Sequence, residues 1–100
     1  MEIRDIRDAA SFTDNKASKV ALATGDHCRV TLWCLEAGQE IRPHAHVGDH
    51  VWVMQEGEGV LLTGEGEHRV APGAVSFVPA GEVHGMRART RLVFTSVSAG

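Results

Sequence analysis

The fold of this chain is constrained most strongly by short β-rich segments that alternate with glycine- and proline-containing breaks. The breaks recur about every 8 to 12 residues, which is typical of an antiparallel sandwich or barrel. Helical patterning is weak and is limited to the stretch Asp8–Asp14. We therefore predict an all-β fold. Its expected strands are Lys19–Thr24, Cys28–Leu35, His50–Gln55, Gly59–Thr63, Glu67–Val70, Ala74–Val78 and Arg91–Val97.

Length and charge limit the classes of protein to consider. The chain has 100 residues, and we expect residues 1–100 to form a single domain. Its formal net charge is -3, whereas nucleic-acid-binding domains are usually basic, so we predict no nucleic-acid partner. No apolar run approaches the ~20 residues of a membrane helix, and the N-terminal residues lack the apolar region of a secretion signal. We expect no membrane association and a cytoplasmic location.

Some of the expected strands are apolar on both faces, as in Val51–Met54 and Val75–Val78. The outer face of so small a barrel should be mostly polar, so another surface must cover these strands. Because most soluble oligomers are symmetric dimers, we predict a homodimer.

The distribution of histidine indicates where chemistry could occur. Three of the six histidines, His44, His46 and His50, fall within seven residues. The two-residue spacing places His44 and His46 on one face of a strand, ~7 Å apart at Cα. The short segment that follows can turn the chain so that His50 faces the same centre, and His84 is a fourth candidate. Because imidazole nitrogen binds Zn, Cu, Fe and Ni, these residues predict a metal site.

The first histidine segment resembles the first motif of the cupin family. Gly38 is followed by five residues, by His44-Ala-His46, by three residues, by His50, by six residues and by Gly57. The family motif has a glutamate ligand where this chain has His50. This replacement is the main departure from the pattern.

The second histidine segment resembles the second motif of the same family. Gly73 is followed by five residues, by Pro79-Ala-Gly81, by two residues, by His84 and, after three more, by Ala88. The family motif ends in asparagine where this chain has Ala88. That change removes a structural polar contact and no ligand.

The resemblance implies a double-stranded antiparallel β-helix, the jelly-roll barrel of cupins, with core motifs at residues 38–57 and 73–88. It implies one divalent transition metal (Zn, Ni, Fe, Mn or Cu) held at the barrel mouth by His44, His46, His50 and His84. Homodimers are common among such cupins. Four neutral imidazoles would leave the metal with a formal charge of +2, which favours an anionic substrate and strengthens Lewis acidity.

Residues near the expected ligands are candidates for a substrate pocket. Trp52 and Met54 share strand parity with His50, and Met86 shares parity with His84, so these three would line either a pocket or the barrel core. Arg42 lies two residues before the histidine pair and would either bind an anionic substrate or be solvated.

Glu82 shares parity with His84 and would be either a base or a solvated loop carboxylate. The resemblance implies a metal-dependent enzyme acting on a small organic substrate, with a dioxygenase as the first reaction class and an isomerase or lyase next. The alternatives are a non-catalytic module that binds or senses a metal or metabolite, and a barrel used for assembly alone. An open metal coordination favours the enzyme, and a closed tetrahedral one favours the other roles.

Overall fold

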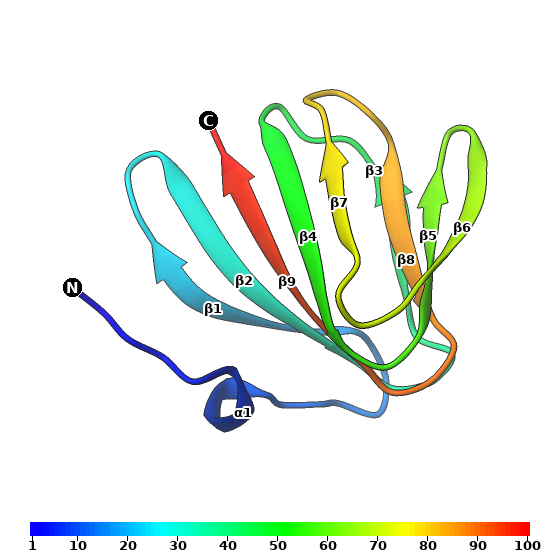
Figure 1. Cartoon of the computed structure of the whole chain (residues 1–100), viewed down its shortest axis with the longest axis horizontal. Helices are drawn as coiled ribbons and strands as arrows, with labels where there is room; N and C mark the ends of the chain where they lie inside the picture. Colours follow the sequence, from blue (N-terminus) through cyan, green and yellow to red (C-terminus); the bar gives the residue numbers. More distant parts are fainter.

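Two antiparallel β-sheets face each other in the computed structural model, which describes residues 1–100 (Figure 1). The larger sheet has the strand order β1-β2-β9-β4-β7, and the smaller has the order β3-β8-β5-β6. The prediction of an all-β fold is therefore confirmed. The elements are α1 (Ile6–Ala9), β1 (Ser18–Thr24), β2 (Cys28–Leu35), β3 (Glu40–His44), β4 (Asp49–Glu56), β5 (Gly59–Thr63), β6 (Gly66–Val70), β7 (Val75–Val78), β8 (His84–Ala88) and β9 (Leu92–Ala99).

The seven expected strands are all present, and their ends differ from the expected ones by at most two residues. Two further strands, β3 and β8, were not among them. They carry Pro43 and Gly85, residue types that weaken a strand pattern in sequence. Both strands belong to the smaller sheet, where they pair with each other.

The helix is placed differently from its sequence prediction over Asp8–Asp14. It is the four-residue segment Ile6–Ala9, which begins after Asp5. The Asp5 side chain accepts a hydrogen bond from the backbone N–H of Arg7 (2.8 Å), so it acts as the N-cap. This cap favours a start at Ile6, two residues before Asp8.

Gly85 allows β3 and β8 to approach closely. A Cβ atom at Gly85 would lie 2.5 Å from the carbonyl oxygen of Ile41 and 2.8 Å from the nitrogen of Pro43. The register of the two strands shifts between Ile41 and His44, after which His44 stands opposite His84. The missing side chain thus permits the pairing that places two histidines side by side.

The main core fills one end of the space between the sheets, which we call the closed end. It is formed by nine buried residues: Leu35, Ile41, Trp52, Met54, Leu61, Met86, Ala88, Leu92 and Phe94. A smaller cluster lies on the outer face of β1, β2 and β9, where α1 and the residues after it cover Leu22, Leu32, Cys34 and Val93.

The N-terminal segment leaves the outer face of β4 and β7 uncovered. Val75 and Phe77 are 65% and 61% exposed, and Val51 and Val53 beside them are half-buried. These strands therefore carry apolar side chains on both the inward and the outward face, as the sequence indicates. No helix in the structure is long and apolar enough to cross a membrane.

Candidate metal centre

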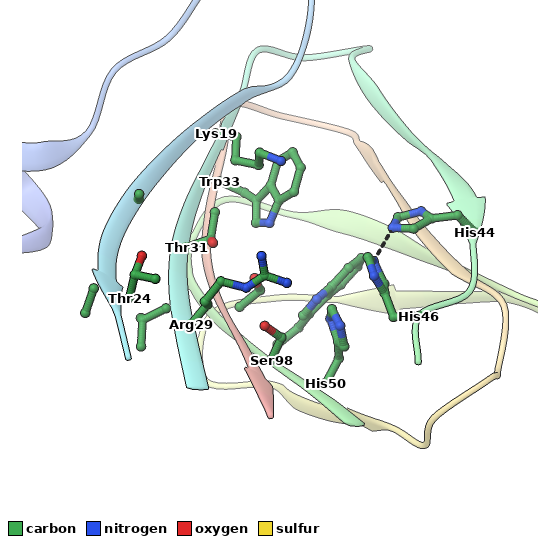
Figure 2. A pocket seen from close by; sticks show the side chains of 14 residues that line it. Lys19, Thr24, Arg29, Thr31, Trp33, His44, His46, His50 and Ser98 are labelled. Carbon is green, nitrogen blue, oxygen red and sulfur yellow. Dashed lines mark hydrogen bonds between the residues drawn. The ribbon is translucent and has the colours of Figure 1, made fainter. Parts of the chain in front are cut away.

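Four histidines gather at the opposite end of the barrel interior, which we call the open end. His44 ends β3, His46 follows it, His50 lies near the start of β4, and His84 begins β8. The centroids of neighbouring rings are 4.1 to 5.5 Å apart. Figure 2 shows three of these rings around one side of a cavity.

His46 lies beyond the end of β3, so the two histidines do not share one strand, yet their rings lie side by side with centroids 4.4 Å apart. The segment around His46 is held in place by backbone contacts. The carbonyl of His46 accepts a hydrogen bond from the N–H of Gly81 (2.8 Å). Two residues later, a Cβ atom at Gly48 would lie 2.1 Å from the carbonyl oxygen of Ala99, so only glycine fits there.

Three histidines present ligand atoms that all lie within 4.8 Å of one another: His44, His46 and His84. The Nε2 atoms of His44 and His46 are 2.6 Å apart. The Nδ1 atom of His44 is 2.8 Å from the carbonyl oxygen of Arg42, and that of His84 is 3.0 Å from the carbonyl oxygen of Glu82. A ring that donates from Nδ1 keeps the lone pair on Nε2, which is the arrangement of a metal-binding histidine.

The Nε2 atom of His84 has no hydrogen-bond partner, although His84 is only 1% exposed. A buried polar atom without a partner is unfavourable, and most such atoms in proteins are satisfied. With Nδ1 donating to the Glu82 carbonyl, Nε2 is a lone-pair acceptor that faces other imidazoles. A bound cation would satisfy this atom, so the residues present fit a metal ion.

His50 lies beside this group of three. It is 8% exposed, and its ring stacks on that of His46 with centroids 4.1 Å apart. Its nitrogen atoms are not part of the group within 4.8 Å. The structure thus brings three of the four expected ligands together and places the fourth ring in contact with them.

Three of the histidines, His46, His50 and His84, have a lowered pKa, which favours the neutral form that binds metals. Burial, reinforced by the nearby rings of His46 and His84, lowers the pKa of His50 to about 4. Burial also lowers the pKa of His84, against the opposing effect of the hydrogen bond to the Glu82 carbonyl. The pKa of His46 is lowered by burial first and then by the charges of its neighbours, which include Arg29.

A cavity of about 460 Å³ opens onto these histidines (Figure 2). Its lining residues come mostly from β1, β2, β4 and β9: Lys19, Ala21, Ala23, Thr24, Arg29, Val30, Thr31, Trp33, His44, His46, His50, Trp52, Ser96 and Ser98. Trp52 lines the cavity and also belongs to the main core cluster, so both of its sequence interpretations apply. Met54 and Met86 are not among the lining residues and are buried in the core cluster at the closed end.

The side chains of Arg42 and Glu82 are solvent-exposed and do not line this cavity. Their backbone carbonyls, which contact histidine rings, are the groups that reach the site. The cations that do line the cavity are Lys19 and Arg29, which the sequence interpretation missed. Arg29 lies on the same face of β2 as Trp33, and this alternation along the strand was the signal that could have placed Arg29 at the cavity.

Comparisons with known proteins agree with this architecture. The sequence profile of the Cupin domain family matches residues 31–98. A search of curated proteins finds no significant match.

Many solved structures share the fold. A protein from Thermus thermophilus is 34% identical with a TM-score of 0.93, covering 99% of this chain and 97% of that one. An RmlC-like cupin from Desulfovibrio desulfuricans is 26% identical with a TM-score of 0.92, covering 99% and 96%. The DMSP lyase DddQ of Ruegeria pomeroyi is 21% identical with a TM-score of 0.79, covering 86% of this chain and 48% of that one, which shows likeness of fold alone.

Proposed function

This chain belongs to the cupin domain family, and from that premise we propose that residues 1–100 act as one domain that holds a divalent transition metal and uses it on a small organic substrate. The observation that carries the proposal is the unpartnered Nε2 atom of buried His84 in a histidine group beside a cavity. The cavity, about 460 Å³, has the size of a small-molecule site. A purely structural metal site needs no such space.

The chain's own residues would orient the ligands. The carbonyls of Arg42 and Glu82 accept from Nδ1 of His44 and His84, which fixes the tautomer and the direction of each ring. When bound, the metal would supply Lewis acidity or redox chemistry at the wall of the cavity. Zn, Ni, Fe, Mn and Cu all accept imidazole ligands, so the donor set does not select among them.

We further propose that His50 is the fourth ligand. Its ring already contacts that of His46, and burial keeps it neutral. A site of four imidazoles carries no ligand charge and leaves the metal with a formal charge of +2. This set differs from the three-histidine, one-glutamate set that the family motif implies, and it would attract anionic substrates.

Metal binding is tested with protein purified without a histidine tag, by elemental analysis and by titration of the metal-free protein with each of the five metals. We expect one metal per chain. Replacing a ligand should weaken binding by more than the roughly 10- to 100-fold typical of residues that only orient a ligand. We expect such a loss for H84A, and for H50A if His50 is a ligand. H68A is the matched control, because His68 is exposed on β6.

Less than a tenth of an equivalent of metal, with no uptake of any of the five metals, would contradict the proposal. A loss for H84A but none for H50A would leave three ligands and remove His50 from the set. Exchangeable water on the metal would support catalysis, with O₂-dependent oxidation screened first and isomerisation or elimination next. A closed tetrahedral site would favour a non-catalytic binding or sensing module.

We also propose that the barrel forms a homodimer through the outer face of β4 and β7. Val75 and Phe77 are exposed there, and the neighbouring Val51 and Val53 extend the same apolar surface. A second copy of the chain is the occupant that best fits a self-complementary apolar face. Sedimentation is expected to give twice the mass of the chain.

A further inference from the structure

The wall of the cavity that faces the histidines carries two cations. Lys19 lies on β1 and Arg29 on β2, and Figure 2 shows both on the side opposite His44 and His46, with the Arg29 side chain extended toward the histidines. The Nζ atom of Lys19 is 5.7 Å from the ring centroid of Trp33, a cation–π contact that keeps the ammonium at the cavity.

Neither cation has an acidic partner. The four ion pairs of the structure, Arg4–Glu2, Arg7–Asp5, Arg87–Glu67 and Arg91–Glu36, all lie elsewhere. No aspartate or glutamate lines the cavity, so the positive charge of Lys19 and Arg29 is not balanced within it. A concave site with charge of one sign concentrates ligands of the opposite sign. The local charge therefore favours an anionic ligand.

The remaining lining residues indicate an organic rather than an inorganic anion. Trp33, Trp52 and Val30 give the cavity an apolar surface, and the hydroxyls of Thr31 and Ser98 add hydrogen-bonding groups beside Arg29. Inorganic phosphate would leave the apolar surface unused. A carboxylate on an apolar body would use both kinds of contact.

We propose that the cavity binds a small organic carboxylate, with the guanidinium of Arg29 holding the carboxylate group and Lys19 adding the second positive charge. A guanidinium matches the two oxygens of a carboxylate with two parallel hydrogen bonds. The opposite end of the ligand then lies toward the histidines. This inference deepens the proposed function. It rests on that function only for the role of the ligand end that lies near the histidines.

The test is binding of acetate, succinate and benzoate against their neutral amides, acetamide, succinamide and benzamide. Binding is measured by calorimetry and by tryptophan fluorescence, since the only two tryptophans, Trp33 and Trp52, both line the cavity. At least one carboxylate should bind at least ~10-fold more tightly than its amide, because its hydrogen bonds are charge-assisted. R29Q should remove that preference, and R29K should restore part of it. R69Q is the matched control, because Arg69 is exposed on β6.

Metal-free and zinc-loaded protein are compared so that the two proposals fail separately. Carboxylate binding that needs Arg29 in a protein without metal affinity would support this inference and overturn the metal site. Metal binding with no preference for carboxylates over amides would support the metal site and overturn this inference. Equal effects of R29Q and R69Q would also overturn the role of Arg29. If R29Q unfolds, K19Q tests the same charge, and it should weaken the carboxylate but not the amide.

Discussion

The two ends of the barrel interior are lined by the same strands and differ in chemistry. On β9, Phe94 at the closed end is fully buried among apolar side chains, and Ser96, on the same face, lines the cavity. On β8, Met86 belongs to the core, and His84, on the same face, belongs to the histidine group. Two residues apart on the same face of a strand, one side chain therefore packs in the apolar core and the other belongs to the polar site.

This division shows how a short chain combines a core with a histidine-lined cavity. Strand parity keeps both sets of side chains in the interior, and position along the strand decides which end each one reaches. Trp52 stands at the boundary, with its ring 4.9 Å from that of Phe94 and 5.0 Å from that of His84. We expect the closed end to set the free energy of unfolding and the open end to set ligand binding.

Truncating a buried side chain at the closed end should have the largest effect on stability. The Phe94 side chain is fully buried and packs against Trp33 and Trp52. F94A should lower the free energy of unfolding by about 3–5 kcal/mol, the usual cost of removing a buried phenylalanine. Urea unfolding of the metal-free protein measures this change.

The matched control is S96A, two residues along the same strand face. It removes one hydroxyl at the cavity and should change the free energy of unfolding by less than about 1 kcal/mol. If S96A destabilised the protein as much as F94A, the proposed division between the two ends would be wrong.

Acid should destabilise the metal-free protein through the open end. The pKa of His50 is about 4 in the folded protein and near the ordinary 6.5 when the chain is unfolded, so the unfolded state binds the extra proton between these values. Stability is therefore greatest above pH 6.5 and falls as the pH drops toward 4, by up to about 3 kcal/mol. Burial also lowers the pKa of His46 and His84, which adds to the effect in the same direction.

Urea unfolding between pH 7.5 and 4.5 measures this dependence. H50Q should flatten the curve, whereas H68Q should leave it unchanged because His68 is exposed. A stability that does not change between pH 7.5 and 4.5 would show that the open end tolerates charged imidazoles.

Most of the fold could be predicted because strands bounded by glycine and proline leave a local pattern. The strands that escaped prediction, β3 and β8, depend on contacts between distant segments. Gly85 weakens β8 in sequence, yet its missing side chain is what lets β8 pair with β3 near Pro43. No local pattern reveals a close approach of that kind.

The candidate site was predictable where it depends on spacing within one segment. His44 and His46 come from one such segment, and the structure groups them with His84. The cations Lys19 and Arg29 were missed because they lie on strands far from the histidines in sequence. They reach the cavity only because β2 pairs with β9, which in turn pairs with β4.

A substitution on the outer face of β7 should have the smallest effect on the barrel interior. Phe77 is 61% exposed on β7, and its Cα partner is Val51, which faces away from the histidine site. F77S should therefore change the free energy of unfolding of the single chain by no more than about 0.5 kcal/mol and leave metal affinity unchanged. It should nonetheless shift the sedimenting species from two chains to one. A loss of metal affinity in F77S would mean that the outer face and the open end are coupled through β4, contrary to the separation that strand parity predicts.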